Sequence, residues 1–442
     1  MPYKKRVPFM KKNTPEAANR RSFLKKTGTV VLGSTLGLNL VLPKTTFAQS
    51  QDVLKVGLIG CGGRGTGAAS QALKADPNVV ITAMGDAFQD RLDQAYDILL
   101  KMHPDKVKVA SENKFIGFDA YQRVMESDVD VVLLTTPPGF RPDHLEAAVK
   151  AGKHIFCEKP VAVDAPGVRK VLSAAKVAKQ KGLSLVSGFT FRYDLPKRAL
   201  FGKVLDGEVG DIRTVTSTRN GGGLWYFPRQ ANWTDMEYQM RNWYYYNWLS
   251  GDFIVEMIVH SMDMMTWAMG GKLPLKATGT GGRQSRVAEK WGNIYDHFAI
   301  EFDYGNGVKG FNFCRQQTGC SNRNSVEVLG SQGNALVEGS VHKITGKTNW
   351  QYQGETRDMY QVQHDELFAS IRNGQPLNDG ESMANSTMLG ILSRMAAYSG
   401  QTLTWEQALN SNQVLGPAFN QYSWDLKYSV PEPAIPGFTK VL

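Results

Sequence analysis

The chain has 442 residues, of which 42% are hydrophobic and 10% aromatic, so it can form large buried cores and is long enough for more than one domain. Its formal net charge is +10, but residues 1–48 hold ten of the 51 Lys and Arg and only one of the 41 Asp and Glu. The rest of the chain has 41 basic and 40 acidic residues, a balance that gives no signal for a nucleic-acid partner.

The excess positive charge belongs to an N-terminal leader. The motif R-R-S-F-L-K-K begins at Arg20 and Arg21, an apolar stretch follows over residues 30–42, and a small-x-small site ends at Ala48. This pattern resembles a twin-arginine export signal. The apolar stretch is shorter than the roughly 20 residues that span a bilayer, so we expect removal of residues 1–48 rather than a stable membrane anchor. We therefore expect folded export to the periplasm or another extracytoplasmic location.

The four cysteines show no C-x-x-C pair and no Cys/His spacing typical of zinc sites. The sequence thus indicates neither a disulfide scaffold nor a metal site. A pairing of Cys314 with Cys320 after export stays open.

From residue 52 to residue 182, apolar runs alternate with helix-compatible segments. The expected strands lie in residues 53–60, 79–86, 129–136, 154–160 and 183–189, and the expected helices in residues 68–75, 88–102, 144–151 and 166–181. Such alternation predicts an α/β Rossmann domain with a doubly wound parallel sheet, whose strand ends form one ligand-binding edge.

After about residue 205 the strands become longer and alternate apolar with polar residues, as in 211–218, 297–304 and 308–314. The turn Y-G-N-G at residues 304–307 predicts an antiparallel hairpin. We expect residues 183–442 to form an α+β domain with an open, mostly antiparallel sheet. Its last helix, 381–399, should end at Gly400.

A glycine-rich turn follows the first expected strand. Gly60, Gly62 and Gly65 occupy the three glycine positions of G-x-G-x-x-G, and Gly63 and Arg64 stand between the last two. With a strand before it and a helix after it, this pattern predicts a dinucleotide site, where backbone N–H groups and a helix N-terminus approach the pyrophosphate.

Asp86 closes the next strand, about 20 residues further on, where a dinucleotide site has an acid that binds the ribose hydroxyls. A carboxylate there repels a 2′-phosphate, so NAD is the expected cofactor. Arg64 could reach such a phosphate, which keeps NADP as the alternative.

Three further segments form longer motifs: residues 135–148, residues 151–160, which read A-G-K-H-I-F-C-E-K-P, and residues 251–263. All three resemble the Gfo/Idh/MocA family, named after glucose–fructose oxidoreductase and inositol 2-dehydrogenase. Residues 151–160 are similar to the family signature A-G-K-H-V-x-x-E-K-P. Residues 135–148 resemble the segment after the fourth major strand, with His144 in the expected place, and residues 251–263 resemble the D-x-x-x-H-x-x-D segment. The resemblance extends from residue 54 to about residue 397.

The resemblance implies a Rossmann domain and a sheet domain that holds the substrate against the nicotinamide. It implies that Lys159, preceding a cis proline, lies at the hydride-transfer centre and that His260 accepts the hydroxyl proton, roles that suit a cation and a base. It assigns Asp263 to substrate binding or orientation. Glu256 stands where the family often has Asp, which puts its role in doubt. His260 and Glu256 are also one helical turn apart, so an ordinary structural pair stays open.

Further residues near the strand ends are expected to line the cofactor: Thr136, Pro137, His144, Glu158, Lys159 and Arg192. Residues 224–249 are rich in Trp, Tyr, Arg and Asn, a composition that suits either sugar stacking or an interface. We expect interface or core, because the family resemblance also implies a homo-oligomer, a dimer or tetramer.

The leader and the glycine-rich turn, together with what the family resemblance implies about the substrate, therefore predict an exported NAD(P)-dependent oxidoreductase acting on a sugar, glycoside or inositol. Since free NAD is scarce outside the cytoplasm, we expect the cofactor to be tightly bound. One alternative, which the resemblance also suggests, is an NAD-dependent glycoside hydrolase using transient C3 oxidation and elimination, although the intact E-K-P motif favours the dehydrogenase. The other is a non-catalytic NAD- or sugar-binding protein.

Overall fold

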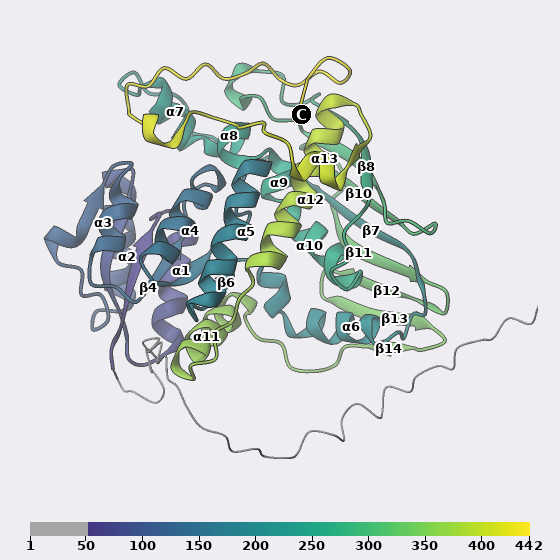
Figure 1. Cartoon of the computed structure of the whole chain (residues 1–442), viewed down its shortest axis with the longest axis horizontal. Coiled ribbons are helices and arrows are strands. Elements are labelled where there is room, and N and C mark those ends of the chain that lie inside the picture. The colour runs from purple at the N-terminus through teal and green to yellow at the C-terminus, as the bar shows by residue number, and fades with distance from the viewer. Residues whose placement is uncertain (1–51) are drawn as a thin grey trace, which may run out of the picture. The chain divides into compact units, whose positions relative to one another are not determined.

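The computed structural model describes residues 52–442, and the expected export leader lies outside the described residues. The described part contains two sheets, one parallel and one mixed, with helices around and between them (Figure 1). Both predicted sheet types are confirmed.

The first sheet is parallel and has the strand order β3-β2-β1-β4-β5-β6. Its strands are β1 (Leu54–Ile59), β2 (Val79–Asp86), β3 (Lys114–Ile116), β4 (Val131–Leu134), β5 (His154–Cys157) and β6 (Leu185–Ser187). Because both faces are covered by helices, the strands are apolar on both sides: β4 reads V-V-L-L and is wholly buried. β6 pairs with β5, so this sheet extends beyond residue 182, where the sequence placed the end of the domain.

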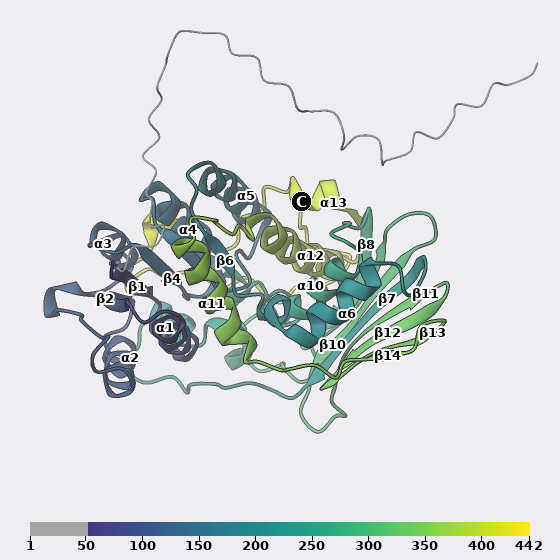
Figure 2. The ribbon, with the colours of Figure 1, turned by 90° about the horizontal axis from the view of Figure 1, so that it is seen from below.

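Helices cover the two faces of the parallel sheet as the Rossmann pattern predicts. The elements α3 (Ala120–Glu126), α4 (Arg141–Lys150) and α5 (Ala165–Gln180) pack on one face, and α1 (Gly63–Ala75), α2 (Gln89–Met102) and α11 (Met359–Arg372) on the other (Figure 2). The short 3-10 helices here are η1 (Ser111–Asn113) and η2 (Pro138–Phe140). α11 returns from the second half of the chain, and no local sequence pattern predicts that it packs on the first sheet.

The second sheet has nine strands in the order β14-β13-β12-β11-β7-β10-β9-β8-β15. They are β7 (Ile212–Gly221), β8 (Lys276–Gly282), β9 (His297–Asp303), β10 (Lys309–Gln316), β11 (Arg323–Gly330), β12 (Gly333–Glu338), β13 (Val341–Gly346), β14 (Trp350–Gln351) and β15 (Leu403–Thr404). β7 and β10 are parallel and the other pairs antiparallel. The predicted β9–β10 hairpin is present, and Asn306 and Gly307 take positive φ in its turn.

Helices of the second half pack between the two sheets (Figures 1 and 2). These are mainly α10 (Val259–Ala268) and α12 (Gly380–Ser399), and α12 ends at Gly400 with φ +69°, as expected. The other helices are η3 (Thr190–Tyr193), α6 (Leu195–Leu205), α7 (Asp235–Arg241), η4 (Trp243–Tyr245), α8 (Asn247–Ser250), α9 (Phe253–Glu256), η5 (Glu289–Trp291), α13 (Trp405–Leu409) and η6 (Phe419–Gln421). Arg394 of α12 is buried and donates to the carbonyls of Val163 and Gly251, which joins the two halves.

Many of the aromatic residues of 224–249 form core within this chain. Trp248 is buried, and its ring stacks on Tyr422 of the C-terminal segment at a centroid distance of 5.9 Å. Tyr244 and Tyr245 are buried as well. The expectation of core for this segment therefore holds for these residues.

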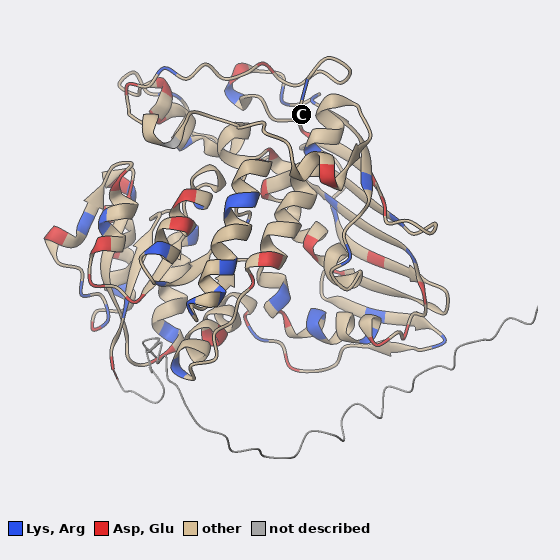
Figure 3. Cartoon of the chain, viewed as in Figure 1, with Lys and Arg blue, Asp and Glu red and all other residues tan. Residues whose placement is uncertain are grey.

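The described residues show balanced charge and free thiols. Lys and Arg are interspersed with Asp and Glu over both sheets and their helices (Figure 3). All four cysteines are free, with Cys314 buried and Cys320 exposed, so the pairing left open by the sequence is absent from the structure. Within residues 52–442, no helix is both long and apolar enough to cross a membrane.

Candidate active site

A cavity of about 570 Å³ lies where the glycine-rich turn faces the second half of the chain, a size suited to a small-molecule site. Twelve of the residues predicted from sequence line it: Gly60, Gly62, Gly63, Arg64, Gly65, Asp86, Thr136, Pro137, Glu158, Lys159, Glu256 and His260. Residues separated by up to 200 positions in the chain thus meet in one place.

Each of the three motif positions requires glycine for a different structural reason. Gly60 has φ +96°, which favours glycine, and a Cβ on Gly65 would lie 1.9 Å from the carbonyl oxygen of Gly60. A Cβ on Gly62 would meet nothing within 4 Å, because Gly62 faces the cavity at the N-terminus of α1. The turn therefore leaves an open approach to backbone N–H groups and a helix N-terminus, as a pyrophosphate requires.

Asp86 is the last residue of β2, and its side chain is hydrogen-bonded to the glycine-rich turn. Its two carboxylate oxygens accept hydrogen bonds from the backbone N–H groups of Cys61 at 2.6 Å and Phe88 at 2.9 Å. Burial raises the pKa of Asp86, while these two hydrogen bonds oppose the rise. Since each carboxylate oxygen has more than one lone pair, Asp86 keeps acceptor capacity towards the cavity.

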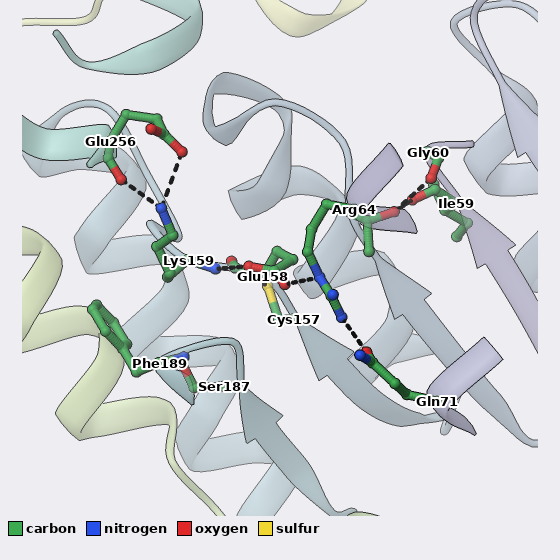
Figure 4. Close-up of polar contacts among 11 residues, drawn as sticks. Ile59, Gly60, Arg64, Gln71, Cys157, Glu158, Lys159, Ser187, Phe189 and Glu256 are labelled. Carbon is green, nitrogen blue, oxygen red and sulfur yellow. Dashed lines mark hydrogen bonds and ion pairs between the residues drawn. The ribbon is translucent and has the colours of Figure 1, made fainter. Parts of the chain in front are cut away.

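Arg64 and Glu158 form an ion pair at the base of the turn. The Arg64 Nε donates to Glu158 Oε1 at 2.7 Å and its Nη2 donates to Gln71 Oε1 at 2.7 Å (Figure 4). Glu158 is only 4% exposed, so a partner for its charge is required. Arg64 is thus engaged by the protein itself, which weakens the case for its binding a 2′-phosphate.

Lys159 points from the end of β5 towards the second half of the chain. Its Nζ donates to the backbone carbonyl of Glu256 at 2.7 Å and to Glu256 Oε1 at 3.0 Å (Figure 4). The Lys159–Pro160 bond is cis, as the resemblance implied. Glu256 ends α9 and His260 lies in α10, with a break at residues 257–258, so the two are not on one continuous helix.

His260 lies against two aromatic rings, Phe189 at 6.0 Å and Phe191 at 5.0 Å between centroids. Its Nδ1 is buried and has no hydrogen-bond partner among the described residues. Burial, and then the positive charges of Lys159 and Arg219, lower the pKa of His260 well below its usual value. At neutral pH the imidazole is therefore uncharged and able to accept a proton.

Three predicted residues do not line this cavity. His144 is buried behind it, where its Nδ1 lies 3.1 Å from Thr136 Oγ1 and its ring stacks on Tyr121. Asp263 is completely buried and holds Arg192 in a bidentate ion pair with distances of 2.8 to 2.9 Å. His144 thus contacts the cavity residue Thr136, and the structure does not place His144, Arg192 or Asp263 at the cavity surface.

Sequence reasoning missed several cavity residues. Trp225, Phe227 and Trp243 line it from the aromatic segment, and Arg241 lies beside them. The aromatic density of residues 224–249 was the available signal, but the sequence analysis favoured interface or core for the whole segment. Arg141 and Tyr360 also line the cavity and had no distinguishing motif.

The residues present fit a nicotinamide dinucleotide. Gly62 and Gly63 provide the open backbone cradle, and Asp86 provides an acceptor one strand away. Thr136 and Pro137 line the adjacent wall, and Lys159 with His260 forms the far end.

Two family models match the chain and together cover more than half of it. The model described as "Oxidoreductase family, NAD-binding Rossmann fold" matches residues 54–189, and the "GFO/IDH/MocA C-terminal domain" model matches residues 200–336. The first model spans all six strands of the parallel sheet, and the second spans the second sheet from β7 to most of β12.

Individual proteins resemble the chain more distantly. An inositol 2-dehydrogenase of Rhizobium meliloti is 28% identical over 254 residues, covering 55% of this chain and 68% of the relative. A glycosyl hydrolase family 109 protein of Shewanella baltica is 27% identical over 218 residues, covering 45% of this chain and 46% of the relative. The crystal structure of an aldose–aldose oxidoreductase from Caulobacter crescentus, complexed with glycerol, has a TM-score of 0.63 at 18% identity and covers 80% of this chain and 99% of its own; this likeness concerns the fold.

Proposed function

Because the chain belongs to the Gfo/Idh/MocA family of oxidoreductases with an NAD-binding Rossmann domain, we propose that it oxidises a hydroxyl group of a sugar, glycoside or inositol by hydride transfer. The observation that carries the proposal is the meeting of Lys159, His260 and the glycine-rich turn in one cavity. The name of the Rhizobium meliloti relative, an inositol 2-dehydrogenase, supports a polyol substrate.

The chain's own residues supply the acid–base part of this reaction. The dinucleotide, when bound, supplies the hydride acceptor. His260 is uncharged at neutral pH and takes the proton of the substrate hydroxyl, and Lys159 stabilises the oxygen as negative charge develops on it. Glu256 fixes the position of the Lys159 ammonium through two hydrogen bonds.

We propose further that the enzyme is exported by the twin-arginine pathway and keeps its cofactor bound. The R-R-S-F-L-K-K leader supports export. Trp225, Phe227 and Arg241 line the same cavity as the glycine-rich turn. Because both halves of the chain form the cavity walls, we expect slow release of a bound dinucleotide. A homo-oligomer is also part of the proposal, since the apolar Phe313 and Leu329 are exposed on the second sheet.

The test begins with protein purified without added nucleotide and then denatured, so that any released dinucleotide can be identified. A second, native sample is then loaded with the dinucleotide that was identified. It is screened with sugars, glycosides and inositols for the absorbance of reduced nicotinamide. His260→Ala should lower kcat by a factor on the order of 10² to 10⁴ while dinucleotide affinity is unchanged. His297→Ala, on β9 outside the cavity, is the matched control. Equal kcat in wild type and His260→Ala would remove the proposed role.

A second candidate is an NAD-dependent glycoside hydrolase, which the similarity to the glycosyl hydrolase family 109 protein favours. The two candidates differ in net redox change. Release of the aglycone from a glycoside with no net change in nicotinamide absorbance would favour the hydrolase, whereas accumulation of reduced nicotinamide with an oxidised sugar supports the dehydrogenase.

A further inference from the structure

The short helix α9 begins after Asp252, a residue with an unusual backbone conformation. Asp252 has φ +74° and ψ 160°, and it follows Gly251, which has φ +79°. A residue other than glycine is strained in this region and stays there only when its surroundings hold it, and strain of this kind is concentrated at functional sites. The contacts of Asp252 must therefore be strong enough to offset the strain.

The carboxylate of Asp252 joins distant parts of the second half of the chain. It is completely buried and accepts hydrogen bonds from the backbone N–H of Phe253 at 2.5 Å, the backbone N–H of Tyr295 at 2.9 Å and the hydroxyl of Tyr398 at 2.5 Å. Tyr398 belongs to α12, and Tyr295 lies in the segment that leads into β9. The start of α9 is thus fixed to a central helix and to the entry of the second sheet.

The backbone carbonyl of Asp252 holds the other end of α9. It accepts hydrogen bonds from the N–H groups of Val255 at 3.0 Å and Glu256 at 2.9 Å. Since α9 has only four residues, it is too short to be stable without such anchors. Glu256 in turn accepts from Lys159 Nζ through its carbonyl and its carboxylate (Figure 4). Hydrogen bonds therefore connect α12 to the ammonium of Lys159 through Asp252 and Glu256.

We propose that Asp252 is a positioning residue of the active site: its carboxylate holds α9 so that Glu256 keeps the ammonium of Lys159 at the hydride-transfer end of the cavity. This inference rests on the proposed function and deepens it by naming the group that sets the position of the cation. A reaction of this kind requires placement within about half an ångström. Asp252 does not line the cavity, so it acts only through these contacts.

The ionisation of Asp252 makes this arrangement depend on pH. Burial raises the pKa of Asp252 to about 6, while the hydrogen bonds from Tyr398 and Tyr295 oppose the rise. Protonation takes away acceptor capacity that these donors need, so the position of α9 should be lost as the pH falls through about 6. The charged and titratable groups that surround the carboxylate come from several elements: Arg394 and Tyr398 of α12, Arg283, Arg286 and Tyr295 between β8 and β9, Cys314 of β10, and Tyr244 of η4.

The experiment measures kcat from pH 5 to pH 8 at saturating NAD, with whichever of myo-inositol, D-glucose and methyl β-D-glucoside is oxidised fastest. The NAD dissociation constant and the melting temperature are measured beside it. The variants are Asp252→Asn, Tyr398→Phe and the control Asp164→Asn. Asp164 is also a buried carboxylate at the start of a helix, α5, and it accepts from two backbone N–H groups, but no residue of α5 lines the cavity.

In wild type, kcat should be about tenfold lower at pH 5 than at pH 8, because a carboxylate with a pKa of about 6 is then mostly protonated. Asp252→Asn should lower kcat at pH 8 by a factor of roughly 10 to 100 and lose this decline, with NAD affinity unchanged because the glycine-rich turn is untouched. Tyr398→Phe removes a hydrogen bond to the ionised form, so its decline should begin at a pH higher by roughly half a unit or more. Asp164→Asn should keep the kcat and the pH dependence of wild type.

Other outcomes overturn the inference. Wild-type kcat in Asp252→Asn, an unchanged pH dependence in Tyr398→Phe, or an equal loss of kcat in Asp164→Asn would each do so. If Asp252→Asn does not fold, the pH dependence of Tyr398→Phe decides alone.

Failure of the proposed reaction can be told apart from failure of this inference. If wild type oxidises none of the three compounds, the proposed reaction fails, and crystal structures of wild type and Asp252→Asn decide the positioning role. Movement of Lys159 Nζ beyond hydrogen-bond distance of the Glu256 carbonyl supports that role, and an unmoved ammonium overturns it. If a compound is oxidised and Asp252→Asn keeps wild-type kcat, the reaction stands and the positioning role is wrong.

Discussion

The Nζ of Lys159 donates to both the backbone carbonyl and the side-chain carboxylate of Glu256, at 2.7 and 3.0 Å. Lys159 follows the parallel sheet and Glu256 ends α9, so this pair joins the two halves of the chain at the cavity. The backbone contact fixes the position of Glu256 Cα relative to the ammonium, and the side chain supplies the compensating charge. Glutamate in place of the aspartate often found in relatives is compatible with this geometry.

Glu256→Gln should lower kcat/KM about tenfold, because a neutral amide forms a weaker hydrogen bond with the ammonium than a carboxylate does. The carbonyl of residue 256 still accepts from Lys159, so the fold and the dinucleotide affinity should be unchanged. Steady-state kinetics and a dinucleotide titration check this. Glu301→Gln, at an exposed ion pair with Lys309, is the control. An unaltered kcat/KM would show that the carboxylate has no part in the reaction.

Gly62→Ala and Gly65→Ala should separate binding from stability. A methyl group on Gly62 enters open space at the cavity, so we expect normal stability and a loss of dinucleotide affinity of at least about tenfold, the effect of overpacking by roughly 1.4 kcal/mol or more. On Gly65 the methyl group would collide with the Gly60 carbonyl, so we expect a lower melting temperature as well. Calorimetry and thermal denaturation distinguish the two. A destabilised Gly62→Ala, or one that binds normally, would contradict the geometry.

Asp86 should make the enzyme prefer NAD over NADP by at least about tenfold, since a carboxylate repels a 2′-phosphate. Asp86→Ser removes that charge and should reduce the preference for NAD over NADP, mainly by increasing the affinity for NADP. The measurement is the ratio of the two dissociation constants in both proteins. A wild-type preference for NADP would mean that another residue determines selectivity.

His364 should make the protein less stable in acid. Its ring is completely buried on α11 against Phe156, and burial, followed by the positive charge of Arg64, lowers its pKa from 6.5 to about 3. The unfolded chain then binds a proton below pH 6.5 that the folded chain does not bind until about pH 3, so stability falls as the pH decreases through this window. The loss between pH 7 and pH 5 from this residue is about 2 kcal/mol.

Chemical denaturation of wild type and His364→Phe at pH 7 and pH 5 measures this effect. The free energy of unfolding should fall by about 2 kcal/mol less in the variant than in wild type. The comparison uses the difference between the two pH values, so any constant change from replacing the ring cancels. If the free energy of unfolding falls by the same amount in both proteins between pH 7 and pH 5, burial does not oppose the protonation of His364.

Local patterns carried most of the fold prediction. Alternating apolar runs predicted the parallel sheet, because strands such as β4 are buried on both faces. The Y-G-N-G turn predicted the β9–β10 hairpin, and the spacing of Gly60, Gly62 and Gly65 predicted the turn geometry. In each case the signal and the structure involve residues close together in the chain.

Contacts between residues far apart in the chain could not be predicted from local sequence patterns. The sequence suggested that Arg192 approaches the cofactor and that Asp263 binds or orients the substrate, whereas the two neutralise each other over 71 positions. The division of the aromatic segment into core residues such as Trp248 and cavity residues such as Trp225 depends on packing against the distant C-terminal segment.

A crystal structure of the protein with bound NAD tests the central claim most directly. The account predicts the pyrophosphate at the turn of Gly60 to Gly65 and the nicotinamide ring in contact with Lys159 and within reach of His260. A dinucleotide bound elsewhere, or a ring facing away from both side chains, would contradict it.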